Sequence, residues 1–111
     1  MKFLFISSLK DVSFTIPPPV MRQLMEASLA WVNQKKKEGV ILEMYELAGW
    51  NRWAVICQHE SAESMVRTIS TMPFNAFMNH EIYALADYNT AMKAYIEAVK
   101  ASEQMAPGPP K

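Results

Sequence analysis

Two strand-like segments joined by a short turn stand in the middle of this sequence. They span Val40–Ala48 and Trp53–His59, and the four residues between them include Gly49 and Asn51. Short alternating segments separated by such a turn predict an antiparallel hairpin, so the sheet that contains it cannot be wholly parallel. Strand alternation is expected to place one set of side chains on a common face: Ile41, Glu43, Tyr45 and Leu47.

A helix is predicted on each side of the hairpin. The first begins at Pro19 or Val20, carries an apolar stripe at helical spacing, and ends at Gly39 after three lysines. The second begins after Ser61, a good N-terminal cap, and ends before Pro73.

Two further strands are predicted outside these helices, over Lys2–Leu9 and Glu81–Asp87, with an irregular segment over 73–80 before the second. The resulting order, β-α-β-β-α-β, is that of a ferredoxin-like α+β fold with an antiparallel four-stranded sheet. Because both helices then cover one face of the sheet, the other face needs a partner. We therefore expect a homodimer or a higher homo-oligomer, with facing sheets.

The end of the chain adds one more helix, predicted over Thr90–Glu103 with Asn89 as its cap. A Pro- and Gly-rich tail follows it. We expect a single domain over residues 1–103 and a disordered tail over 104–111.

Composition narrows the classes of partner. Eleven basic and eleven acidic side chains give a formal net charge of zero, which argues against a nucleic-acid or acidic-membrane binder. The only cysteine is Cys57, and the longest purely apolar run is Phe3–Ile6, far short of a membrane span. These features indicate a soluble, cytoplasmic protein.

Three motifs resemble the muconolactone isomerases. Lys37-Glu38-Gly39 at a helix end leads into a strand that closes with Tyr45-Glu46-Leu47-Ala48-Gly49, where the family reads aromatic-Arg-Ile-Ala-Gly. Met72-Pro73-Phe74-Asn75-Ala76-Phe77-Met78 matches the family's Leu-Pro-Leu-Phe-Pro-Tyr-Met before the last strand. The resemblance implies a dimeric α+β barrel and a cofactor-free proton transfer within a five-membered lactone. That chemistry needs a base near an acidic C–H and stabilisation of the enolate.

The sequence departs from the family in places that bear on the reaction. Ser28, Leu29 and Ala30 replace charged residues of the first helix, Gly49-Trp50-Asn51 replaces Gly-His-Tyr, and Asn79 replaces an aspartate. Two alternatives to an isomerase or lyase therefore stay open. One is a non-catalytic ligand-binding or oligomerisation module, and the other is a cofactor-free oxygenase.

Few titratable side chains offer acid–base chemistry. His80, Glu43 and Tyr83 are the candidate catalytic residues, with His80 as the base and Tyr83 as a donor to an enolate. For Glu43 two roles are expected as alternatives. It is either a buried acid–base group or a carboxylate at the subunit interface. A small, apolar, cyclic or aromatic-derived molecule is the expected ligand, contacted by Tyr45, Trp50, Phe77 and Met78. No metal or cofactor is expected, because His59 and His80 are not at ligand spacing and glycine-rich phosphate loops are lacking.

Overall fold

A computed structural model describes residues 1–49 and 51–105 of the chain. Trp50 and residues 106–111 of the predicted tail lie outside the described residues, whereas residues 104 and 105, predicted as tail, end a helix. The strands are β1 (Lys2–Leu9), β2 (Ile41–Leu47), β3 (Arg52–Gln58) and β4 (Met78–Leu85), and the helices are α1 (Pro18–Lys37), α2 (Ala62–Ile69) and α3 (Tyr88–Met105). Two short 3₁₀ turns, Asp11–Thr15 and Asn75–Phe77, precede α1 and β4.

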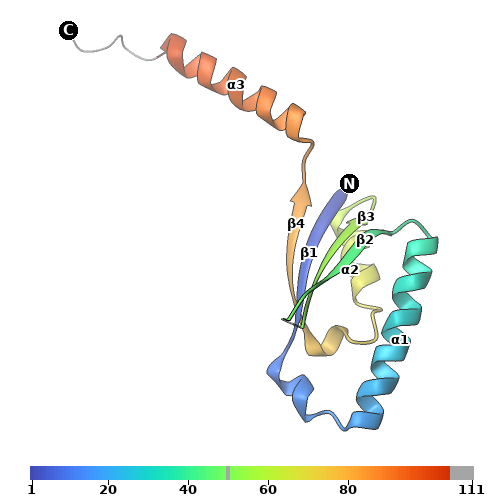
Figure 1. The fold of residues 1–111 in the computed structure, drawn as a ribbon. Coiled ribbons are helices and arrows are strands. Elements are labelled where there is room, and N and C mark those ends of the chain that lie inside the picture. The colour runs from blue at the N-terminus through green and yellow to red at the C-terminus, as the bar shows by residue number, and fades with distance from the viewer. Residues whose placement is uncertain (50, 106–111) are drawn as a thin grey trace.

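The four strands form one antiparallel sheet in the order β2-β3-β1-β4. Helices α1 and α2 lie on the same side of this sheet, and α3 projects from the end of β4 (Figure 1). This arrangement confirms the predicted ferredoxin-like α+β fold. None of the helices within the described ranges is long and apolar enough to cross a membrane.

The core lies between the sheet and α2. Phe3 and Phe5 of β1, Cys57 of β3 and Met65 of α2 are each at most 4% exposed, and Val55 and Ile69 pack against them. Helix α2 begins with a capping box in which Ser61 Oγ accepts from Ser64 N and Ser64 Oγ accepts from Ser61 N. Both helix-terminal amides are thereby satisfied, and the short helix can present Met65 to the sheet.

The strand pairing divides the sheet into two faces. We call the side beneath α1 and α2 the helix-side face and the other the open face. By register and alternation, the open face carries apolar side chains (Leu4, Ile6, Tyr45, Leu47, Ile56, Tyr83 and Leu85) together with polar ones that include Lys2, Glu43, Arg52 and Glu81. Neither α1 nor α2 covers it (Figure 1).

One predicted face of the hairpin is wrong. The pairing register shifts between Ile41 and Glu43, so Ile41 pairs with Cys57 while Glu43 pairs with Ile56. A bulge adds one residue to a strand and reverses the alternation beyond it. Ile41 is therefore buried on the helix-side face, apart from Glu43, Tyr45 and Leu47.

Two other local expectations also need correction. Strand β4 begins at Met78 instead of Glu81, because Met78 pairs with Leu9 and His80 with Ser7 of β1. Helix α3 is capped by Asp87 and not by Asn89: Asp87 Oδ2 accepts from Thr90 N at 3.0 Å.

Candidate active site

An apolar cleft of about 320 Å³ separates α1 from the sheet. No residue of α1 is buried, because its apolar stripe faces this space instead of packing directly on the strands. Four apolar side chains from different elements define its walls: Val32, Met44, Trp53 and Met78.

A smaller cavity of about 40 Å³ continues inward from the cleft. Val32, Met44, Trp53 and Met78 line both spaces, so the cavity is the inner end of the cleft. Most of its lining is apolar, and its polar contributors include Ser7 of β1 and His59 after β3. Such an enclosure suits a small ring with few polar groups.

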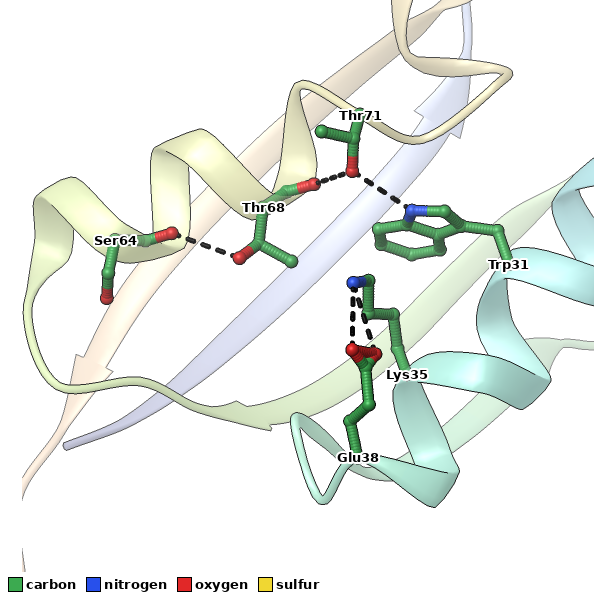
Figure 2. A network of polar contacts seen from close by, with 6 residues as sticks. All are labelled: Trp31, Lys35, Glu38, Ser64, Thr68 and Thr71. Carbon is green, nitrogen blue, oxygen red and sulfur yellow. Dashed lines mark hydrogen bonds and ion pairs between the residues drawn. The ribbon is translucent and has the colours of Figure 1, made fainter.

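A hydrogen bond joins α1 to the turn after α2 beside the inner cavity, which Trp31 and Thr68 help to line. Trp31 Nε1 donates to Thr71 Oγ1 at 3.0 Å, and Thr71 Oγ1 donates to the carbonyl of Thr68 at 2.7 Å (Figure 2). Lys35 Nζ lies 5.8 Å from the Trp31 ring centroid and 3.2 Å from Glu38 Oε2. The Trp31–Thr71 bond links the C-terminal half of α1 to the turn after α2, and Lys35 flanks that link from within α1.

Ser7, His80 and Asn75 form a hydrogen-bonded chain beside the cavity. Ser7 Oγ lies 2.7 Å from His80 Nδ1, and His80 Nε2 lies 2.9 Å from Asn75 Oδ1. An amide oxygen can only accept, so this geometry assigns the ring proton to Nε2 and leaves Nδ1 to accept from the Ser7 hydroxyl. Ser7 is 3% exposed and lines the cavity, whereas His80 stands behind it.

The surroundings of His80 favour its neutral form. Burial and the positive charge of Lys10 both lower the pKa of His80 below its ordinary value of 6.5. The ring also packs edge-on against Phe5, with centroids 6.0 Å apart. A histidine held neutral near pH 7 can accept a proton without first losing one.

His59 is the other histidine on the helix-side face. Burial, the N-terminal ammonium group and Lys35 lower its pKa. It lines the cavity but is not part of the chain that links Ser7, His80 and Asn75. Burial raises the pKa of the neighbouring Cys57 thiol to about 11, which makes that cysteine a poor nucleophile.

The predicted site residues are divided between the two faces of the sheet. His80 and Met78 lie on the helix-side face, and Met78 lines the cleft. Glu43, Tyr45 and Tyr83 lie on the open face and are exposed in the protomer. The Tyr83 hydroxyl donates to Glu81 Oε2 at 2.9 Å, and this bond raises the Tyr83 pKa. One protomer therefore does not bring His80 together with Glu43, Tyr45 or Tyr83.

The predicted ligand contact at Phe77 is not found in the protomer, where its neighbour Phe74 takes the place at the cleft. Phe74 is buried, and Phe77 packs edge-on against it with ring centroids 6.3 Å apart. Phe74 lines the cleft, whereas Phe77 lines neither the cleft nor the cavity.

Four polar residues of this region were not predicted as site residues from the sequence. Ser7 follows Phe3 and Phe5 at inward-facing positions of β1, a pattern that could have identified it. Asn75 stands where the isomerase motif has phenylalanine. Ser28 and Lys36 of α1 line the cleft, and the buried Ser28 hydroxyl has no hydrogen-bond partner in the described part of the chain.

No three acidic, histidine or cysteine side chains among residues 1–49 and 51–105 are grouped so as to hold a metal ion. The hydrogen bond between Ser7 and His80 gives the described side chains a route for proton transfer beside the cavity.

Comparison with known proteins gives the family. The fold is similar to that of crystalline muconolactone isomerase, with a TM-score of 0.71 and 20% identity over 79% of this chain and 91% of that one. It is also similar to 5-chloro-2-hydroxyhydroquinone dehydrochlorinase from Burkholderia phenoliruptrix AC1100, solved with 2,5-dihydroxybenzoquinone. Here the TM-score is 0.63 and the identity 16%, over 81% of this chain and 98% of that one. No curated protein sequence matches the chain. The sequence model of muconolactone delta-isomerase matches residues 1–91, and the chain belongs to that family.

Proposed function

We propose that this protein is a cofactor-independent enzyme that moves a proton within a small unsaturated lactone. The observation that carries the proposal is the chain of hydrogen bonds from the apolar cavity through Ser7 to a neutral His80. A substrate ring in the cleft would place its acidic C–H at the inner end, against the Ser7 hydroxyl. Ser7 would accept the carbon-bound proton while passing its own to His80 Nδ1, and the proton would return to a different carbon.

Asn75 and Ser28 serve two further needs of this reaction, the orientation of the base and the stabilisation of the enolate. Asn75 accepts from Nε2–H, so it fixes the tautomer in which Nδ1 is basic and favours the imidazolium that forms. Ser28 lines the cleft, and its unpaired hydroxyl would turn outward to donate to an enolate or carboxylate oxygen. The exposed Lys36 ammonium at the cleft supplies a positive charge for a substrate carboxylate.

The internal packing favours an enzyme over a purely oligomer-forming module. Phe74 is buried within its own protomer, so it is not a free contact for a neighbouring subunit. The cleft that Phe74 helps to line leads to the hydrogen-bonded series that starts at Ser7 and His80. A module that serves only oligomerisation does not require such a series. An apolar cavity alone would not distinguish these two functions.

We further propose a homodimer in which the open faces of two copies pack together. Tyr45 and Tyr83 are 61% and 49% exposed, and they lie among aliphatic residues of that face. Glu43 and both tyrosines would then serve the subunit interface, separate from the Ser7–His80 chain. Burial of the apolar side chains of this face would provide the free energy for such association.

Replacing Ser7 with alanine tests the proposed relay. The Ser7→Ala enzyme is expected to isomerise muconolactone about 10- to 100-fold more slowly, because His80 loses its connection to the cavity. The change in ultraviolet absorbance of the lactone gives kcat and KM, and the effect should fall mainly on kcat.

Ser7→Thr is the matched control, since it keeps a hydroxyl at the same strand position. It should recover most of the activity that Ser7→Ala loses. Equal activity of wild type and Ser7→Ala would exclude the relay, and a wild-type enzyme inactive on muconolactone but active on hydroxylated aromatic rings would exclude the lactone as substrate.

A further inference from the structure

Helix α3 leaves the body of the protein instead of packing on it. Only Ala86 and Asp87 separate it from β4, and the 18-residue helix extends away from the sheet (Figure 1). Within the described residues it makes no extensive contact with any other helix or strand. The family match ends at residue 91, so most of this helix lies beyond the part shared with the isomerases.

One side of α3 is an apolar stripe. Tyr88, Met92, Tyr95 and Val99 recur at spacings of four, three and four residues, and they are 71%, 37%, 66% and 57% exposed. Such spacing places side chains in one row along a helix. Because an isolated helix of this length is only marginally stable in water, the stripe needs a packing partner.

The charges on the other side of α3 argue against two classes of partner. Lys100 Nζ lies 3.5 Å from Glu97 Oε1, and the remaining charges are one lysine and one glutamate, Lys93 and Glu103. The polar side is therefore electrically balanced. Nucleic acids and acidic lipid surfaces are bound by helices with an excess of positive charge, which α3 does not have.

The stripe begins beside the open face of the sheet. Tyr88, its first residue, lines a hollow of about 560 Å³ together with Ile56 and Leu85 of the open face. A partner that covers the open face at this point also meets the start of the stripe. The chain has no formal net charge, so a second copy approaches this surface without overall electrostatic repulsion.

From these observations we infer that α3 is an arm that packs on a second copy of this chain, the copy that covers the open face. In a two-fold dimer the α3 stripe of each protomer would pack on the other protomer, so symmetry would bury both stripes. The inference rests on the dimer described above, but not on the reaction assigned to Ser7 and His80.

Charges placed within the stripe test the arm in the full-length protein. The double variant Tyr95→Glu/Val99→Glu is expected to raise the dimer dissociation constant at least about tenfold, because two carboxylates would replace buried apolar contacts. Sedimentation and light scattering over a dilution series give this constant. Circular dichroism should show helix loss that accompanies dissociation.

Ala94→Glu/Ala101→Glu is the matched control, because it adds the same charges to the opposite, exposed side of α3. It should dimerise like the wild type. An unchanged dissociation constant in the stripe variant would overturn the arm while leaving a sheet-mediated dimer intact. A monomeric wild type would overturn both the arm and the dimer, and neither outcome depends on catalytic turnover.

Discussion

The His80→Gln enzyme is expected to have a kcat/KM about 10²- to 10⁴-fold below that of the wild type. Glutamine can preserve hydrogen bonds to Ser7 and Asn75, which lie 2.7 Å and 2.9 Å from the imidazole nitrogens. It cannot accept a proton near neutral pH. The variant should therefore fold normally and bind the lactone, and steady-state kinetics should place the loss in kcat.

Glu43→Gln is the appropriate comparison for this variant. It removes a carboxylate from the open face, which lies on the other side of the sheet from His80. Its kcat/KM should stay within about threefold of the wild type, since this carboxylate lies on the opposite sheet face from the reacting atoms and the change to glutamine keeps its size for the subunit interface. If Glu43→Gln lost activity and His80→Gln kept it, the base would lie on the open face.

Phe5→Ala is expected to lower the free energy of unfolding by about 3 to 5 kcal/mol. Phe5 is 3% exposed at the centre of the sheet and packs with Phe3, Cys57 and Met65. Removing its ring would leave a cavity beneath α2 and remove the edge-on contact with His80. Urea denaturation followed by tryptophan fluorescence measures the change.

Phe5→Leu separates packing from the loss of aromatic character. Leucine fills much of the same volume, so this variant should lose less stability than Phe5→Ala. A loss below about 1 kcal/mol in Phe5→Ala would contradict the assignment of Phe5 to the core, because such values are typical of surface substitutions.

Local sequence signals were sufficient for most of the fold. The hairpin turn, the cap at Ser61 and the helix end at Gly39, whose φ is +77°, are determined by neighbouring residues. The start of β4 was less predictable, because Met78, Asn79 and His80 become strand through pairing with β1, some 70 residues earlier in the chain. The bulge after Ile41 likewise depends on its alignment with β3.

The candidate site was predictable only in part, for the same reason. His80 was identified from its chemistry, and its neighbours Ser7 and Asn75 come from β1 and the turn before β4. His80 and Tyr83 are three residues apart in one strand, so alternation places them on opposite faces. That separation could not be predicted while the strand was taken to begin at Glu81.

The pH dependence of kcat/KM tests most directly whether neutral His80 is the base. Since burial and Lys10 lower the His80 pKa, activity should fall with decreasing pH as the ring becomes protonated, with a midpoint below pH 6.5. The midpoint should match the titration of His80 followed by nuclear magnetic resonance of its ring, and it should be absent from the residual activity of His80→Gln. A midpoint above 6.5, or one that persists in His80→Gln, would contradict the assignment of His80 as the catalytic base.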